Sequence, residues 1–272
     1  MPSGLPACEV SELQAPDGGP TSYLLGTMHL PHPDVLAVGK AVWPKVATAQ
    51  QLILEIRVDS EQMWLLMGLA RAREDLEQVL GTDLFQRFCA EVSTRGGNCA
   101  QLRHLKLWVA AQSLAVPRAP SQRFSVSPLD LWLGLQAEAA HLPLVGLETA
   151  AEQVGFFEAI PVADQVQELE DTLNRKEALD GELAQMLSLY LAGDLVGLEA
   201  LTNDTTALDP KWKAMLLDQR NAQWLSRLPA MLSERPSFVA VGAAHLVGPH
   251  GLLVGLTQRG FHCRPVPLTT GH

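Results

Sequence analysis

Residues 23–29 read Tyr-Leu-Leu-Gly-Thr-Met-His, a short apolar run followed by a glycine and, three residues later, a histidine. We predict a strand that ends at this glycine. Residues 34–50 then place valines at helical spacing, and residues 51–58 form an apolar run of strand length with branched residues. Such a run is typical of a buried parallel strand. The pattern predicts a β-GxxH-α-β unit.

The same pattern recurs near the other end of the chain. Residues 237–241 predict a strand, residues 242–245 read Gly-Ala-Ala-His, and a helix at 251–259 is followed by a strand at 261–266. Gly260 is a helix stop signal between those last two elements. Two copies of one unit therefore bracket the sequence.

Between the two units, apolar residues recur mostly every three or four positions, which predicts helices. One strand is predicted at 142–147, directly before Glu148 and Thr149, and no low-complexity linker is present. Helices are predicted at 60–80, 84–92, 100–114, 128–141, 163–192, 195–202 and 211–232. We predict one α/β domain over 1–272, with a sheet core (about 20–60, 142–150 and 236–268) built from the two units and a helical insertion (about 60–235) between them.

The composition excludes several classes of partner. The 272 residues carry a formal charge of -10, which disfavours phosphate backbones, so we expect no nucleic acid. No apolar run reaches the ~18–20 residues of a membrane-spanning helix. The first residues lack the features of a signal peptide, so we expect a cytoplasmic protein, or a periplasmic or secreted one if an export signal has been removed. The oligomeric state stays open.

The cysteines and tryptophans carry weaker signals. The four cysteines form no CxxC pair, so we expect small core or surface residues, although a Cys89–Cys99 disulfide stays open. Trp64, Trp108 and Trp132 are expected to pack in the core, with an apolar groove or a dimer surface as the alternative.

Four polar residues each stand where a predicted strand ends: His29, Glu55, Glu148 and His245. The carboxyl ends of parallel strands meet at one edge of a sheet, where ligands bind, so these strand ends predict one site. GxxxxGK[ST], GxGxxG, GxSxG and HExxH are all absent, which removes the main support for nucleotide, dinucleotide and serine-hydrolase functions.

Each strand-end residue also has a simpler explanation. A single GxxH would favour a buried structural histidine, but two copies favour a site, with the glycine supplying a conformation that other residues resist. Glu55 needs a partner on a buried strand, either Arg57 or a metal or imidazole. Glu148 either belongs to the site or marks a helix N-terminus.

Arg220 and Asn221 add a further signal. Trp212, Leu216, Arg220 and Trp224 recur every four residues, which places a guanidinium inside an apolar stripe. A surface arginine whose stem covers apolar area is the simple alternative. We expect Arg220 to reach the carboxylates or a developing oxyanion.

These motifs resemble the TraB/GumN/Tiki family over residues 23–266. The matching segments are residues 23–29, Leu54-Glu55, 146–149 with Glu152-Gln153, Gly193-Asp194, Arg220-Asn221 with Trp224, and 241–252. The resemblance implies an α/β fold related to the erythromycin-esterase and ChaN-like group. It also implies a metal-dependent protease that prefers manganese or cobalt, with His29, Glu55 and His245 in the site.

We therefore predict a metal-dependent hydrolase of peptide or protein substrates. His29, Glu55 and His245 would hold a divalent ion, for which zinc also fits the mixed N/O ligands. Glu148 would act as general base, and Arg220 and Asn221 would steady the tetrahedral intermediate. The alternatives are a metal-free esterase-like hydrolase with His29 as base and Glu55 orienting it, and a non-catalytic peptide- or haem-binding protein.

Overall fold

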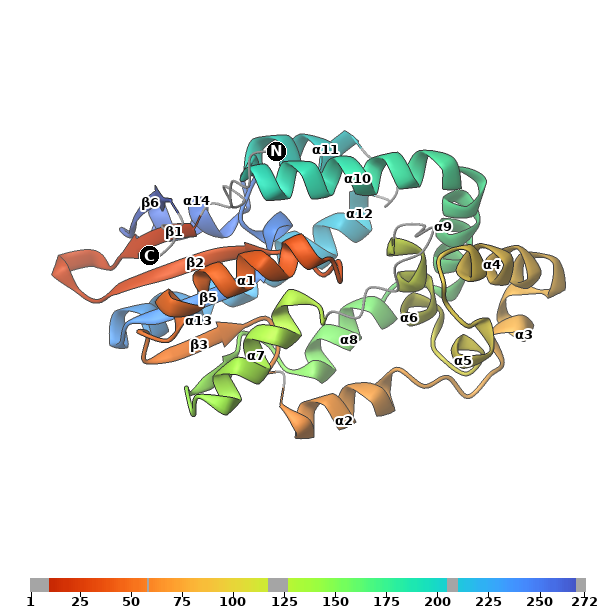
Figure 1. Cartoon of the computed structure of the whole chain (residues 1–272), viewed down its shortest axis with the longest axis horizontal. Coiled ribbons are helices and arrows are strands. Elements are labelled where there is room, and N and C mark those ends of the chain that lie inside the picture. The colour runs from red at the N-terminus through yellow and green to blue at the C-terminus, as the bar shows by residue number, and fades with distance from the viewer. Residues whose placement is uncertain (1–9, 58, 117–126, 205–209, 268–272) are drawn as a thin grey trace.

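The computed structural model describes residues 10–57, 59–116, 127–204 and 210–267. These residues contain a six-stranded sheet in the order β4-β3-β5-β2-β1-β6, with helices on both faces (Figure 1). The strands are β1 (Val10–Gln14), β2 (Thr21–Thr27), β3 (Gln51–Leu54), β4 (Leu144–Gly146), β5 (Ser237–Gly242) and β6 (His262–Val266). The α/β fold with a helical insertion is confirmed.

The four strands from β4 to β2 are parallel, whereas β1 runs antiparallel to both β2 and β6. β5 lies between β3 and β2, so the two GxxH motifs follow neighbouring strands. Gly26 pairs with Val241 and Thr27 with Gly242. The last strand of the second unit, β6, pairs with β1 instead of β5, so the two units are not closed in the same way.

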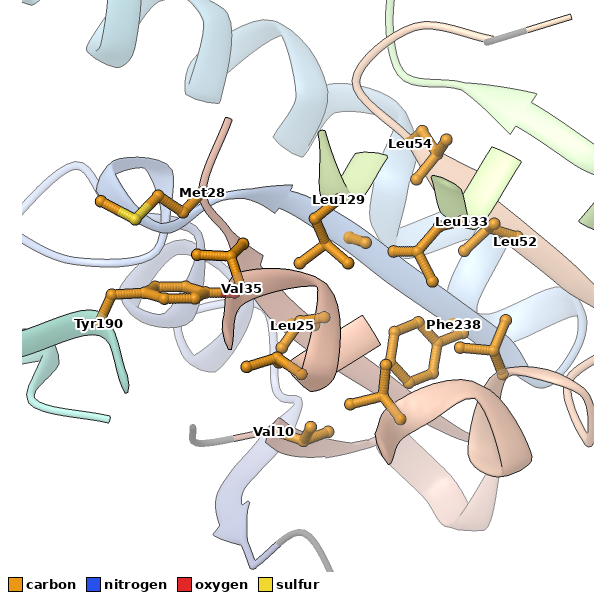
Figure 2. Packing of buried hydrophobic residues seen from close by; sticks show 14 of the residues in the cluster. Val10, Leu25, Met28, Val35, Leu52, Leu54, Leu129, Leu133, Tyr190 and Phe238 are labelled. Carbon is orange, nitrogen blue, oxygen red and sulfur yellow. The ribbon is translucent and has the colours of Figure 1, made fainter. Parts of the chain in front are cut away.

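Successive side chains of a strand point to opposite faces of the sheet. Helices cover both faces, so the side chains of the central strands are buried on each. Leu25 and Leu54 pack with α1 (Pro33–Val46) and α7 (Leu129–Ala139) on one face (Figure 2). Leu24 and Ile53 pack with α13 (Arg220–Glu234) and α14 (Leu252–Thr257) on the other. This two-sided burial explains the continuous apolar runs in the sequence.

Most of the other helical elements lie between β3 and β5 along the chain, while η1 (Pro16–Gly18) lies between β1 and β2 and η4 (Ala243–His245) directly follows β5. Those between β3 and β5 are α2 (Ser60–Leu69), α3 (Leu76–Leu80), α4 (Thr82–Thr94), α5 (Cys99–Leu102), α6 (Leu107–Ala111), η2 (Gln112–Ala115), α8 (Ala150–Glu158), α9 (Val162–Asn174), α10 (Lys176–Ala192), α11 (Leu195–Asp204), α12 (Pro210–Lys213) and the π-helical η3 (Ala214–Gln219). Along the described chain, no helix combines the length and apolar content needed to cross a bilayer. That the whole chain is one domain stays a prediction.

Part of the insertion packs around a core of its own, formed by side chains such as Phe88, Val92 and Leu107 from α3, α4, α6 and α9. Cys89 and Cys99 form a disulfide there, with their Cα atoms 5.2 Å apart. The disulfide alternative that the sequence left open is therefore found for these two, and Cys8 lies outside the described residues. Cys263 is a free thiol.

Several element boundaries differ from the predictions. β1 was not predicted, and β3 ends at Leu54 instead of residue 58. The single helices predicted at 60–80, 100–114, 163–192 and 211–232 are each interrupted in the structure. The π-helical η3 separates α12 from α13, and such wide turns are often found at functional sites.

Candidate active site

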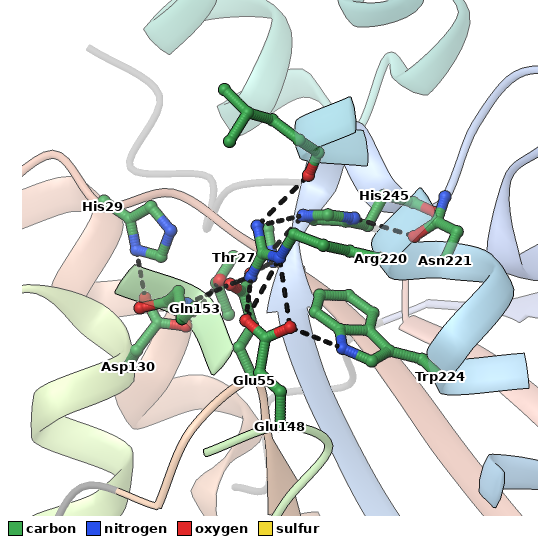
Figure 3. Close-up of polar contacts among 12 residues, drawn as sticks. Thr27, His29, Glu55, Asp130, Glu148, Gln153, Arg220, Asn221, Trp224 and His245 are labelled. Atoms are coloured by element: carbon green, nitrogen blue, oxygen red, sulfur yellow. Dashed lines mark hydrogen bonds and ion pairs between the residues drawn. The ribbon is translucent and has the colours of Figure 1, made fainter. Parts of the chain in front are cut away.

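The sheet edge brings the predicted residues together (Figure 3). Glu55 directly follows β3, Glu148 follows β4 by two residues, and the backbone N–H of Glu148 donates to the carbonyl of Glu55 at 2.9 Å. His29 follows β2 by two residues, and His245 ends the short turn η4 after β5. The prediction that the strand ends converge is confirmed by this geometry.

Arg220 joins the two carboxylates. Its Nη2 donates to Glu55 Oε2 and to Glu148 Oε1, each at 2.6 Å, and its Nε donates to the Glu148 carboxylate at 3.1 Å. The arginine side chain is 6% exposed, so the surface alternative is wrong. The alternative partner of Glu55, Arg57, pairs instead with Asp59.

Glu148 is the most enclosed member of the cluster, with a fully buried side chain. Its Oε2 also accepts a hydrogen bond from Trp224 Nε1 at 3.0 Å, so both oxygens have donors. Burial raises the pKa of Glu148, while Arg220 opposes that rise. The helix cap of α8 is Thr149, whose side chain bonds the backbone N–H of Glu152, so Glu148 is not the cap.

Glu55 has a different set of donors. Its Oε1 accepts from the backbone N–H of Gly242 at 2.8 Å, and its Oε2 accepts from Gln153 Nε2 at 3.2 Å as well as from Arg220. Burial by itself would raise the pKa of Glu55, but His245, which is protonated at the low pH where Glu55 titrates, and Arg220 outweigh burial and lower it to about 2. The carboxylate is therefore ionised.

His245 is held in one tautomer by Asn221. The Asn221 side-chain NH₂ donates to the carbonyls of His245 (3.2 Å) and His250 (2.9 Å), so Asn221 Oδ1 must accept the proton on His245 Nδ1 at 2.7 Å. Burial lowers the pKa of His245 to about 4, and Arg220 adds to the decrease. The imidazole is neutral, and its Nε2 carries the lone pair.

His29 lies at the open side of the cluster, with 67% of its side chain exposed. Its Nδ1 is 2.9 Å from Asp130 Oδ2, and the other Asp130 oxygen accepts from Thr27 Oγ1 at 2.7 Å. The charge of Asp130 raises the pKa of His29 well above its ordinary value. Asp130 was missed in the sequence, because an acidic residue in the first turn of a helix is a common stabilising feature.

The comparison with known families agrees with this arrangement. A sequence model of the TraB/PrgY/gumN family matches residues 13–265, which is most of the chain. The protein belongs to the TraB/PrgY/gumN family. The resemblance drawn from the motifs is thereby confirmed.

Relatives of this TraB/PrgY/gumN protein include one bacterial and several animal proteins. The uncharacterized protein YbaP of Shigella flexneri is 26% identical over 239 residues, covering 86% of this chain and 87% of YbaP. Metalloprotease TIKI2 of Danio rerio is 23% identical, and metalloprotease TIKI1 of Homo sapiens is 22% identical. The alignments cover 91% of this chain and 59% and 60% of those two proteins. No solved structure gives a significant match.

The names of the Tiki relatives imply a metal, and Gly242 provides a test of whether the residues of this TraB/PrgY/gumN protein fit one. A Cβ atom at Gly242 would lie 3.2 Å from Glu55 Oε1, 3.5 Å from His245 Cδ2 and 3.9 Å from His29 Nε2. The absent side chain thus leaves a small space bordered by all three predicted ligands. Two imidazoles and a carboxylate are a ligand set that zinc, manganese and cobalt accept.

The arrangement also contains a competitor for the ion. Arg220 Nη1 lies 3.2 Å from His245 Nε2, on the lone pair that a metal would use. Among the side chains that the structure describes, no group of three histidine, cysteine, aspartate or glutamate residues is already placed to hold an ion. The residues fit a divalent ion in their chemistry, and binding requires Arg220 to give up its contact with His245.

Gly26 and Gly242 lack the glycine-specific backbone conformation that the GxxH motif predicts. Neither has a positive φ angle. Gly26 is instead needed for close packing, because a Cβ there would lie 2.9 Å from the Cβ of Ala243. The two GxxH motifs therefore pack directly against each other.

Proposed function

We propose that this protein is a metal-dependent hydrolase that cleaves peptide bonds, with His29, Glu55 and His245 holding the ion. The observation that carries the proposal is the space at Gly242, which Glu55 Oε1, His29 Nε2 and the His245 ring all border. The metalloprotease names of the Tiki relatives support the same reaction class.

The surrounding residues would orient the two histidines. Metal-bound histidines usually donate their other ring nitrogen to an oxygen, which fixes the ring and its tautomer. Asn221 does this for His245, and Asp130 is placed to do it for His29. Asn221 is thus assigned a positioning role in place of contact with the tetrahedral intermediate.

When bound, a divalent ion would polarise the scissile carbonyl and lower the pKa of a water molecule. Arg220 is the cation nearest to the ligands, and we assign it to the developing oxyanion through Nη1 once that atom leaves His245. Glu148 has hydrogen-bond donors on both oxygens, so we assign it to hold Arg220 in place instead of acting as general base.

A metal-free hydrolase is the second candidate, and the His29–Asp130 pair favours it. An exposed imidazole whose Nδ1 is held by a carboxylate can accept a proton from water through Nε2 when the ring is neutral, and the raised pKa of His29 moves that state to alkaline pH. In this version Asp130 orients His29, a role first expected for Glu55.

Calorimetry on metal-stripped protein tests the leading proposal. We expect the wild type to bind one manganese, cobalt or zinc ion, and His29→Ala, Glu55→Gln and His245→Ala to lose that binding while keeping the wild-type circular dichroism. His104→Ala, which changes an exposed histidine in the insertion, is the matched control and should bind as the wild type does.

Hydrolysis of dye-labelled casein by the same proteins completes the test. Activity that depends on the added ion and disappears in the three variants supports the proposal. Full activity after exhaustive chelation would overturn it in favour of the metal-free candidate, and the loss of that activity in Asp130→Asn would strengthen the latter.

A further inference from the structure

A hollow of about 220 Å³ lies between α2 and α7, on the side of the sheet that α7 covers. Its walls are mostly apolar, and two carboxylates also line it. The lining residues are Asp59 at the start of α2, Met63, Trp64 and Met67 of α2, and Leu131, Leu135 and Glu138 of α7. Figure 1 shows α2 at the lower edge of the molecule, with α7 above it.

This hollow leaves large apolar side chains in water. Trp64 is 74% exposed, Met67 is 52% exposed and Leu135 is 45% exposed. Scattered apolar residues on a surface are normal, but a group of them around a hollow marks a binding surface. The expectation that Trp64 packs in the core is wrong, and the groove alternative describes it better.

The hollow and the candidate active site share helix α7. Asp130, which holds His29, directly precedes Leu131 in α7, and Leu131, Leu135 and Glu138 follow one another along one face of that helix. The segment after Glu55 leads into α2 within five residues. An extended chain that passes over His29 and runs along α7 would therefore reach the hollow.

The size of the hollow selects the kind of occupant. Pockets that enclose drug-sized molecules have volumes of about 300–1,000 Å³, so this one suits a side chain that belongs to a larger partner. Glu138 at the margin and the net charge of -10 favour a basic residue next to that side chain.

We propose that the hollow is a substrate subsite that takes a large apolar side chain of an extended peptide, with a lysine or arginine of the peptide beside Glu138. The inference rests on the proposed function, since it places the peptide bond to be cleaved over His29. It assigns the substrate class: peptides that pair a bulky apolar residue with a basic one.

Peptide binding tests this subsite without requiring turnover. The probe is a fluorescein-labelled ten-residue peptide of glycine and serine with one central Phe-Lys pair, and its affinity is measured by fluorescence anisotropy. Burial of a large side chain contributes roughly 1.5–3 kcal/mol, so Trp64→Ala and Leu135→Ser should each weaken binding by about tenfold or more. Replacing the peptide lysine with glutamate should weaken it about two- to fivefold.

The matched control is Val196→Ala, which truncates a side chain that is 77% exposed on α11 and should leave binding unchanged. His29→Ala separates the two proposals. If that variant and the wild type bind the peptide equally and Trp64→Ala does not, the subsite stands even where no protein hydrolyses casein.

Four results would overturn the subsite. The first is wild-type affinity in Trp64→Ala, and the second is no peptide binding by the wild type. The third is a dimer, seen by sedimentation, that Trp64→Ala dissociates without a change in peptide affinity. The fourth is loss of sedimentation with anionic lipid vesicles in Trp64→Ala, again with unchanged peptide affinity.

Discussion

The two GxxH histidines end neighbouring strands but occupy opposite environments. His245 is 4% exposed, lies against the ring of Trp224 and has a lowered pKa, whereas His29 is 67% exposed and has a raised one. Both strands have a neighbour on each side, so the difference arises because Arg220, Asn221 and Trp224 of α13 pack against His245. One motif thus yields a rigid buried group and an accessible one.

The buried half of the site consists of Glu55, Glu148, Arg220 and His245. Its carboxylates and guanidinium are shielded from water, so they are stabilised by pairing with each other. The exposed half, formed by His29 and Asp130, is held by two hydrogen bonds of Asp130, one to His29 and one from Thr27. We therefore expect substitutions in the buried half to change stability and those in the exposed half to change mainly the chemistry.

The largest effect is expected from Arg220→Met. Removing the guanidinium leaves two buried carboxylates with no countercharge, and the loss of one partner from a buried ion pair costs about 3–5 kcal/mol. The free energy of unfolding in urea measures it. Arg227→Met is the control, because Arg227 and its partner Glu152 are both more than 40% exposed and such pairs contribute about 1 kcal/mol or less. Equal stability of the two variants would contradict the role of Arg220.

An intermediate effect is expected from Gly26→Ala, which tests the contact between the two motifs. The added methyl group would meet the Cα and Cβ atoms of Ala243 at 3.0 and 2.9 Å, and overpacking of this kind costs about 1–3 kcal/mol. In Gly181→Ala the methyl group meets nothing within 4 Å on α10, so that variant should gain up to about 1 kcal/mol. A neutral Gly26→Ala would show that the motifs are not tightly packed.

The smallest effect on stability is expected from Asp130→Asn in the exposed half. The variant weakens hydrogen bonds to His29 and Thr27, which lowers the free energy of unfolding by about 1.5 kcal/mol or less. The pKa of His29 in metal-free protein should decrease toward its ordinary value, because the charge that raises it is gone. The imidazole then loses its proton at a lower pH, which NMR of the ring hydrogens measures.

The pKa of His245 in the same NMR titration is the internal control. It should stay low in Asp130→Asn, since burial causes its decrease. An unchanged pKa of His29 would mean that Asp130 does not control that residue, and the comparison between the two halves would lose its basis.

Much of the site follows from local pattern. An apolar run of strand length followed by a polar residue predicts where that residue stands, because buried parallel strands all end at one edge. His29, Glu55, Glu148 and His245 are found together for this reason. The place of Arg220 in the site was also predictable, since an arginine in an apolar stripe needs a buried partner.

Sequence patterns could not predict the contacts between distant segments. Asp130 reaches His29 from a helix that begins a hundred residues later, and its position depends on how α7 packs on β3 and α1. The strand β1 has only five residues and is recognisable only beside β2. The π-helical η3 likewise alters the helix that was predicted to continue through Arg220.

Sequence patterns alone therefore established the fold class, the two GxxH units and the strand-end residues, since burial and strand direction act through neighbouring residues. The environment of each residue was decided by packing. Whether a histidine is neutral and enclosed or charged and exposed depends on which helix covers its strand. Tertiary contacts also decide that Trp64 is exposed and that Glu148 forms an ion pair with Arg220. Desolvation and ion pairing depend on distances between elements far apart in the chain.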